Sequence, residues 1–419
     1  MLKKDDFTVI DIVDLNADGF GVGRVNDFVL FVNGGLPGDK LEVKFIENKK
    51  SYGIAEIVKV LLPSTHRVKP RCPATNRCGG CQWQHCDYQT QLLFKKKIVI
   101  DALTRIGGIK EPPVKDVVGM ENPWSYRNKA AFQTSTESGM FTIGMYEPQS
   151  HRIVEVDKCA IQHPAHILII KTLREFGSLL NIRRVVIRVG FSTSDVMVNI
   201  ETDKPDDSLI KALKSAGATT ILLNKKLVFG PGYIREQLAD IFYHISASSF
   251  FQVNPLQTKV LFDIALNQAL PKNSEEFSFV DAHCGVGSIA LYAAKKARYG
   301  IGVDSEPNAI KDAKKNAALN GIKNIKFLRN TAEAALPELL DKKPHTVFLD
   351  PPRKGCGSEL ISALITNTPK NIVYISCEAA TLARDIKKLT KGGYNLIDVR
   401  PVDMFPMTGK TEVSCLLSI

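Results

Sequence analysis

Residues 277–304, FSFVDAHCGVGSIALYAAKKARYGIGVD, contain the clearest structural signal in the chain. An apolar run ends at Asp281 and leads into a glycine-containing turn that closes at Gly287. A helical pattern then covers 288–297, and a second apolar run ends at Asp304. The alternation of apolar runs and helical patterns continues through 307–320, 325–328, 346–349 and 371–376. Strands that alternate with helices predict an α/β fold with a mostly parallel, doubly wound sheet.

The turn after the first strand has the composition of a nucleotide-binding loop. Glycines between a strand and a helix let a ligand approach the backbone beside the helix N-terminus. Read as Gly285-x-Gly287-x-x-Ala290, the turn fits the dinucleotide fingerprint, and Asp304 follows at the distance of an acid that binds ribose hydroxyls. NAD enzymes and S-adenosylmethionine enzymes share this pattern, so the turn alone does not distinguish their cofactors.

Three further reactive groups are predicted at the same edge of the sheet. Asp350-Pro-Pro-Arg353 follows the fourth strand, Cys377 follows the fifth, and Glu412 stands near the C-terminus. Open α/β sheets bind ligands at the carboxyl ends of their strands. A single cysteine at a strand end is usually packed in the core. Here a thiol and two carboxylates are expected to converge, and hydride transfer has no need of that set.

The 419 residues suffice for two or three domains, because single cores stop growing near about 250–300 residues. Short β-rich runs separated by turn residues predict an OB-like barrel for 1–62, although an SH3-like barrel would look much the same. Residues 63–250 mix strands and helices without regular alternation, which indicates an α+β unit. Asn254-Pro255 is a good helix start, so the doubly wound unit is predicted to occupy 251–419.

The formal net charge of +11 is unevenly distributed. Residues 1–62 have 8 basic and 10 acidic groups, a net charge of −2, whereas 63–110 have 9 and 2, a net charge of +7. A local basic excess suits a polyanion such as nucleic acid, and it also suits an ordinary solvated surface. No apolar run approaches the roughly 18 residues of a membrane span, and no secretory signal is visible. We therefore expect a cytoplasmic protein, without a membrane partner and monomeric.

A set of motifs runs along nearly the whole chain in a recognisable order. They are Cys72-x5-Cys78-Gly-Gly-Cys81, Tyr126-Arg-Asn-Lys129, Ser150–Val154 leading to Cys159, Phe251-Gln-Val-Asn254, 281–287, Asp350–Arg353, Ser376–Asp385 and Phe405–Glu412. Together they resemble the RNA (uracil-5-)-methyltransferases, whose last two motifs are SCNPxTLxRD and FPxTxHxE. The N-terminal barrel resembles the TRAM domain of that family. Because the chain combines this barrel with an iron–sulfur segment, it most resembles the bacterial 23S rRNA (uracil-5-)-methyltransferases.

Five positions depart from the family pattern. Glu378 and Ala379 stand where Asn-Pro is usual. Met407 and Lys410 stand where histidines are common, and His283 replaces a residue that is usually aromatic. None of these changes removes the thiol or the terminal carboxylate.

The resemblance implies a covalent mechanism and assigns its residues. C5 of uracil is a poor nucleophile, and addition of a thiolate to C6 makes C5 nucleophilic enough to attack a methyl donor. Cys377 would be this nucleophile, and Glu412 the base that then removes the C5 proton. Such chemistry needs a base that is single-stranded or flipped out of its stack. The residues that would bind S-adenosylmethionine are Gln252, His283, Ser288, Asp304, Asn330 and Asp350.

Cysteines in a cytoplasmic protein are more often ligands or core residues than disulfides. Cys72, Cys78 and Cys81 have a metal-binding spacing, for which zinc is a serious candidate. The resemblance adds Cys159 as a fourth ligand and favours a [4Fe-4S] cluster. Cys86 has no counterpart among the family's ligands and is expected to be packed.

Three alternatives to a ribosomal RNA methyltransferase are a tRNA uridine-C5 methyltransferase, an NAD-dependent oxidoreductase and a non-catalytic RNA-binding protein. Cys377 and Glu412 oppose the last two. If RNA lies against the basic segment, Lys95, Lys96 and Lys97 are expected to contact its phosphates. If the barrel carries the contacts, they must come from its own basic residues, which include Lys40, Lys44, Lys49 and Lys50.

Overall fold

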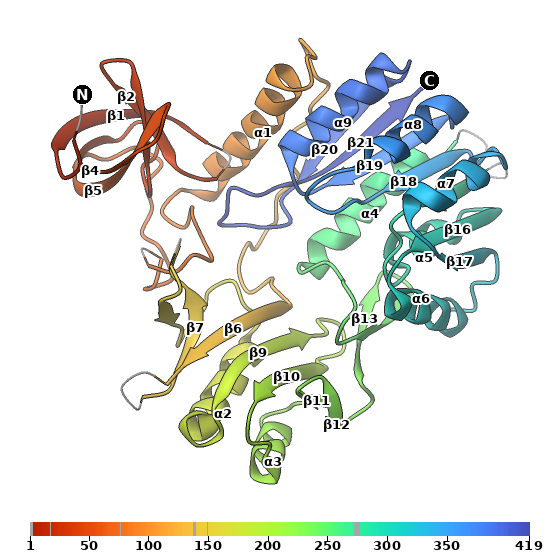
Figure 1. The fold of residues 1–419 in the computed structure, drawn as a ribbon, viewed down its shortest axis with the longest axis horizontal. Helices are drawn as coiled ribbons and strands as arrows, with labels where there is room; N and C mark the ends of the chain where they lie inside the picture. Colours follow the sequence, from red (N-terminus) through yellow and green to blue (C-terminus); the bar gives the residue numbers. More distant parts are fainter. Residues whose placement is uncertain (1–2, 17, 76, 137–139, 149, 272–276) are drawn as a thin grey trace.

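The computed structural model describes residues 3–16, 18–75, 77–136, 140–148, 150–271 and 277–419. Figure 1 shows an N-terminal barrel, a middle unit with its own sheet, and a C-terminal sheet with helices on both faces. Residues 1 and 2 of the proposed first domain lie outside the described residues. Among the described helices, none is both long enough and apolar enough to cross a membrane.

The N-terminal unit is a closed five-stranded barrel in the order β1-β2-β3-β5-β4. Its strands alternate inward apolar residues with outward polar ones, and Leu30, Leu41 and Phe45 fill the interior. The predicted barrel is confirmed. The strands are β1 (Phe7–Leu15), β2 (Gly21–Val25), β3 (Phe28–Val32), β4 (Lys40–Asn48) and β5 (Tyr52–Leu62).

A segment without regular helix or strand, residues 63–87, leads from the barrel to helix α1 (Tyr88–Arg105). Asp87 begins this helix, since its carboxylate accepts a hydrogen bond from the Thr90 N–H at 2.9 Å. Val99 and Leu103 of α1 are buried in the same core as helix α9 (Ala379–Lys391). Figure 1 shows the two helices side by side, so the middle of the chain covers part of the C-terminal unit.

The middle unit is a seven-stranded sheet in the order β12-β11-β10-β9-β6-β7-β8, with a core that includes residues of both its helices. One pair, β10 with β11, is parallel and the others are antiparallel, which confirms the α+β expectation. The elements are β6 (Lys129–Ser135), β7 (Thr142–Tyr146), β8 (Ile153–Glu155), α2 (Pro164–Leu180), β9 (Ile182–Val189), β10 (Val196–Thr202), α3 (Asp207–Ser215), β11 (Thr220–Leu223) and β12 (Lys226–Phe229).

A hairpin of β13 (Tyr233–Leu238) and β14 (Ile241–Ser246) follows the middle sheet. Its buried residues belong to the core of the C-terminal unit, and its backbone accepts and donates hydrogen bonds with Asn316 of helix α6 (Pro307–Leu319). The hairpin thus precedes the proposed boundary at 250/251 and packs beyond it. The boundaries 1–62, 63–250 and 251–419 stay a proposal.

The C-terminal sheet has the order β17-β16-β15-β18-β19-β21-β20, and its first five strands are parallel. Two apolar cores lie on its opposite faces, one with α4, α5 and α6, the other with α1, α7, α8 and α9. The doubly wound prediction is confirmed. The elements not yet given are α4 (Pro255–Ala269), β15 (Ser278–Asp281), α5 (Ser288–Ala294), β16 (Tyr299–Asp304), β17 (Ile325–Arg329), α7 (Ala332–Leu340), β18 (Thr346–Leu349), α8 (Ser358–Asn367), β19 (Asn371–Ser376), β20 (Asn395–Val402) and β21 (Glu412–Ser418).

Candidate active site

The strand order reverses between β15 and β18, and open sheets bind ligands at such a switch point. Asp281 ends β15 and Asp350 directly follows β18. Asp281 is fully buried and one of its carboxylate oxygens has no hydrogen-bond partner. Burial, followed by the nearby charges of Asp350 and Asp304, raises the pKa of Asp281 well above its usual range. Acidic groups therefore surround this end of the sheet.

The glycine turn binds the neighbouring acid through its backbone. Gly285 and Gly287 have φ values of 53° and 84°, a left-handed conformation that favours glycine. The Gly285 N–H donates to Asp304 Oδ2 at 2.9 Å. Nδ1 of His283 is buried without a hydrogen-bond partner, and burial lowers the pKa of its ring, so the imidazole is neutral. Among the described residues, the turn thus contains a buried ring nitrogen without a hydrogen-bond partner.

The other residues predicted to bind a cofactor lie in different surroundings. Ser288 begins α5, and its carbonyl accepts a hydrogen bond from Tyr243 at 2.8 Å. Asn330 follows β17 with an exposed side chain, and its N–H donates to the Asp304 carbonyl at 3.1 Å. Gln252 is buried, and its carbonyl accepts a hydrogen bond from Asn128 at 3.2 Å. The structure thus connects Asn330 and the turn through Asp304.

Cys377 and Glu412 are brought together by strand register. β21 runs antiparallel to β19 and pairs Ser376 with Val413. Cys377, which follows Ser376, therefore lies near Glu412, which precedes Val413. Glu412 is 2% exposed and Cys377 is half-buried. The predicted nucleophile and base therefore adjoin at the edge that also carries Asp350.

The acids of this site hold their protons tightly. Burial raises the pKa of Cys377 to about 11, and Glu412 and Asp350 contribute. The pKa of Glu412 is raised well above its usual range by burial and then by Asp350. Burial raises the pKa of Asp350 to about 7. At neutral pH the resting Cys377 is thus a thiol, and Glu412 is harder to ionise than an exposed glutamate.

Arg353 is the cation of this group and was given no role from the sequence. It hydrogen-bonds Cys377 and opposes the rise in pKa of both Cys377 and Glu412. The available signal was its place in Asp350-Pro-Pro-Arg353, three residues after a carboxylate at the sheet edge.

Alkylation of Cys377 is expected to be slow at pH 7 and to rise about tenfold per pH unit towards pH 10, because only the thiolate reacts. Arg353→Met removes the cation and is expected to slow the reaction further. Lys354→Met changes the exposed neighbouring cation and serves as the control. Iodoacetamide labelling with peptide mass spectrometry measures the rate at Cys377. Fast labelling at pH 7 that is indifferent to Arg353→Met would contradict this assignment.

Two of the departures from the family pattern contact each other. Lys410 Nζ lies 3.4 Å from Glu378 Oε2, and it also lies 3.8 Å from Asp18 Oδ1 of the barrel. A charged pair thus joins the residue after the nucleophile to the segment before Glu412. Met407 has a φ of 69° and is buried.

Cys72, Cys78, Cys81 and Cys159 line a single narrow cavity of about 30 Å³. Burial raises the pKa of Cys81 to about 12, and the three other cysteines contribute to the rise. Within the described ranges, no group of three or more His, Cys, Asp or Glu side chains is arranged to hold a metal ion. Cys86 is buried in a separate apolar cluster, as predicted. The structure therefore gathers the four predicted cysteines without forming a metal site.

The three lysines at 95–97 form ion pairs with acidic residues. Lys95 is fully buried in an ion pair with Asp403, so the expectation that it contacts RNA is wrong. Sequence reasoning counted its charge, but its partner is 308 residues away in the chain. Lys96 and Lys97 are partly exposed and pair with acids, and their contact with RNA stays a prediction.

Comparisons with known proteins agree with this architecture. Residues 87–419 match the model of the tRNA (uracil-5-)-methyltransferase family, and residues 9–58 match that of the TRAM domain. An uncharacterized RNA methyltransferase of Halalkalibacterium halodurans is 38% identical over 100% of this chain and 98% of its own. Another, from Bacillus cereus, is 37% identical over 100% and 97%.

A solved structure extends the likeness to three dimensions. The tRNA (uracil-54, C5)-methyltransferase of Pyrococcus abyssi, in complex with S-adenosyl-L-homocysteine, is 28% identical with a TM-score of 0.78. The match covers 97% of this chain and 99% of that one. The chain therefore belongs to the tRNA (uracil-5-)-methyltransferase family and is an S-adenosylmethionine-dependent RNA methyltransferase with an N-terminal TRAM domain.

Proposed function

We propose that this enzyme transfers the methyl group of S-adenosylmethionine to C5 of a uridine in structured RNA, through a covalent bond between Cys377 Sγ and C6 of uracil. The observation that supports the proposal is the pairing of Ser376 with Val413, because Cys377 and Glu412 are the next residues at these adjoining strand ends. A nucleophile and a base on the same substrate must both reach one ring, and adjoining strand ends provide this.

The reaction needs the proton of Cys377 to leave before C6 is attacked. With a pKa of about 11, roughly one thiol in 10⁴ is ionised at pH 7, so the thiolate must form as uracil binds. Arg353 stabilises it through its hydrogen bond and charge. The C6–S bond forms, and electrons move onto the C5–C4–O4 unit as an enolate. C5 then takes the methyl group from the sulfonium of the donor.

Glu412 completes the cycle by taking the proton from C5, after which the S–C6 bond breaks and Cys377 is regenerated. This role requires the carboxylate form, and Arg353 favours that form. The sulfonium of a bound donor, if held close to Asp350 and Glu412, would lower their pKa values. The buried acids are therefore suited to a cationic methyl donor.

The residues proposed to hold S-adenosylmethionine are Gln252, His283, Ser288, Asp304, Asn330 and Asp350. Asp304 supports this proposal because it lies between the glycine turn and Asn330, where a ribose would be bound. The unpartnered Nδ1 of His283 offers a further polar contact.

Gly287→Ala is expected to weaken S-adenosylmethionine binding by more than the backbone cost of a left-handed alanine, which is roughly 1–2 kcal/mol or about 5- to 30-fold. Its Cβ would also lie 3.1 Å from Phe327 and 3.2 Å from Leu291. Gly285→Ala is the matched control, since its Cβ meets open space and only the backbone cost applies. Isothermal titration calorimetry measures both. Equal losses would show that the crowding at Gly287 does not matter.

For the RNA class, we propose 23S ribosomal RNA, on the resemblance in the motifs, barrel and cysteine segment. Transfer RNA is the second candidate, because the similar Pyrococcus abyssi enzyme is a tRNA (uracil-54, C5)-methyltransferase that matches over 97% of this chain. Mass-spectrometric mapping of 5-methyluridine in both RNAs from a strain lacking the protein tests the two. A missing methyl group in 23S rRNA supports the first candidate, one missing from tRNA supports the second, and unchanged RNA overturns the proposed activity.

We also propose that Cys72, Cys78, Cys81 and Cys159 hold a [4Fe-4S] cluster. The donor set fits, because four thiols line one cavity and their mutual repulsion as thiolates needs a cation to offset it. A single tetrahedral zinc would draw the sulfurs to about 3.8 Å from one another, given Zn–S bonds of about 2.3 Å. A [4Fe-4S] cluster instead binds each of four cysteines to a different iron.

Protein purified without oxygen is expected to be brown and to contain about four irons per chain. Cys78→Ser is expected to lose both colour and iron, because it removes one thiolate. Cys86→Ser, which lies outside the cavity, is the control and should retain them. Zinc in place of iron by elemental analysis would contradict the cluster.

A further inference from the structure

The segment that precedes Glu412 is a buried loop, residues 403–411, between β20 and β21. Asp403 and Met404 are fully buried at its start, and Thr408 and Thr411 are each 8% exposed. The loop ends at Glu412, where β21 begins, and Glu412 pairs with Val402, the last residue before the loop. Its anchors come from segments far away in the chain.

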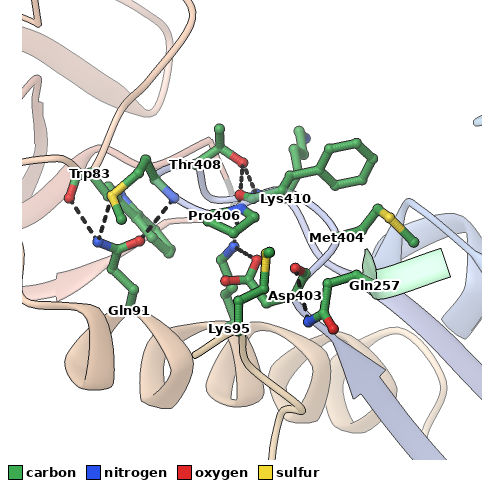
Figure 2. Close-up of polar contacts among 12 residues, drawn as sticks. Trp83, Gln91, Lys95, Gln257, Asp403, Met404, Pro406, Thr408 and Lys410 are labelled. Carbon is green, nitrogen blue, oxygen red and sulfur yellow. Dashed lines mark hydrogen bonds and ion pairs between the residues drawn. The ribbon is translucent and has the colours of Figure 1, made fainter. Parts of the chain in front are cut away.

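Helix α1 holds the first part of the loop (Figure 2). Lys95 Nζ donates to the carboxylate of Asp403 and, at 3.0 Å, to the Phe405 carbonyl. Tyr88 donates its hydroxyl hydrogen to the second oxygen of Asp403 at 2.8 Å. Both side chains of the ion pair are 0% exposed. One lysine thus ties two points of the loop to α1.

The cysteine segment and α1 together hold the middle of the loop. The Met407 carbonyl accepts hydrogen bonds from the N–H groups of Gln82 and Trp83, both at 3.0 Å. The Met407 N–H donates to Gln91 Oε1 at 3.1 Å, and Gln91 also donates to the carbonyls of Trp83 and Cys86. Gln82 directly follows Cys81, so the loop is attached beside the cysteine cavity.

The Lys95–Asp403 pair is buried, so water does not compete for its charge-assisted hydrogen bond. A charge-assisted hydrogen bond inside a protein is stronger and more directional than one at the surface. Lys95 bonds the loop at the residue after β20 ends and again two residues later, seven residues before Glu412. The hydrogen bonds of the Lys95 ammonium group go to Asp403 and Phe405, and not to Cys377 or the cofactor turn. The ammonium group of Lys95 therefore binds the 403–411 loop.

We infer that Lys95, acting through Asp403, is a positioning residue for Glu412: it holds the 403–411 loop in the one conformation that aims the carboxyl group at C5 of the bound uracil. The inference rests on the proposed function of Glu412 as the base. Lys95 would thus contribute to catalysis from a buried position, whereas the net charge of the basic segment suggested only a solvated or RNA-binding surface.

The order of the reaction steps separates this role from simple stability. Addition of Cys377 to C6 and methyl transfer both precede the step that needs Glu412. A displaced base therefore slows only the loss of the C5 proton, and methylated RNA stays bound to Cys377. A displacement of about 1 Å can cost about 100-fold in rate. A variant that merely unfolds forms less adduct, whereas a displaced loop accumulates it.

The test uses the full-length protein, S-adenosylmethionine labelled in its methyl group, and total RNA from a strain that lacks the protein. Labelled adduct is measured on denaturing gels after RNase treatment, and released 5-methyluridine is measured by mass spectrometry. Lys95→Met is expected to lower release about 100-fold and to accumulate adduct, as Glu412→Gln does. Lys95→Met/Asp403→Leu replaces the pair with apolar groups and is expected to fold stably yet still accumulate adduct.

Leu213→Ala is the stability-matched control, because Leu213 is fully buried in the core of the middle unit and does not contact the loop. It is expected to release product without accumulating adduct. If Glu412→Gln traps an adduct while Lys95→Met and the double variant behave like Leu213→Ala, the positioning role is overturned and the proposed function stands. If Glu412→Gln traps nothing, the proposed base is wrong and the inference falls with it.

Discussion

Cys377→Ala is expected to abolish methyl transfer to RNA, because without a thiolate at C6 the C5 atom of uracil cannot attack the methyl donor. The loss should exceed 10⁴-fold, since removal of a covalent nucleophile commonly costs a factor of about 10⁶. Glu412→Gln should instead block removal of the C5 proton and accumulate a methylated protein–RNA adduct, which denaturing gels resolve from free protein. The two variants together test the adjoining positions that the Ser376–Val413 pair establishes.

Cys356→Ala is the matched control for the loss of a thiol in the same unit. Cys356 is buried, and its Sγ lies 3.5 Å from the Tyr374 hydroxyl oxygen. The control should keep its methyl-transfer activity, measured with labelled S-adenosylmethionine. Full activity in Cys377→Ala would refute the covalent mechanism.

Lys95→Met is expected to lower the free energy of unfolding by about 3–5 kcal/mol, because it leaves the buried carboxylate of Asp403 without its cation. The Asp403 carboxylate would still accept the hydrogen bond from Tyr88. Lys95→Met/Asp403→Leu should recover most of this loss, since apolar groups of similar size replace a buried pair at little net cost. Urea unfolding followed by the fluorescence of the two tryptophans measures both.

Lys259→Met breaks an ion pair of another kind and serves as the control. Lys259 and Asp263 are one turn apart on α4, and their side chains are 49% and 42% exposed. The expected change is about 0.5 kcal/mol or less, because water screens exposed pairs. A loss in Lys95→Met as small as this would show that the buried pair adds nothing to stability.

The alternation of strands and helices predicted only part of the site. The glycine turn, Asp304 and Asp350 were placed at one edge because parallel strands end on the same side. Glu412 could not be placed in this way, since the last strand enters antiparallel between β19 and β20. That position depends on pairing between strands, and the resemblance to the family was needed to assign Glu412 before the fold was known.

Burial was the other quantity that local sequence did not reveal. Lys95 stands in a run of three lysines, which is typical of a solvated or RNA-binding face. In the fold it faces Asp403 while Lys96 and Lys97 face other acids. Adjacent residues on a helix point in different directions, so the three lysines of this run contact different acidic residues.

The order of strands and helices, the nucleotide turn and the spacing of Cys72, Cys78 and Cys81 could be read from the chain, because each depends on nearby residues. Cys159 was added by the resemblance to the family. The union of Cys377 with Glu412, the raised pKa values of both, and the burial of Lys95 appeared with the folded molecule. These properties arise from contacts between segments up to 310 residues apart. Strand pairing and exclusion of water create them, and neither is encoded in any short stretch of residues.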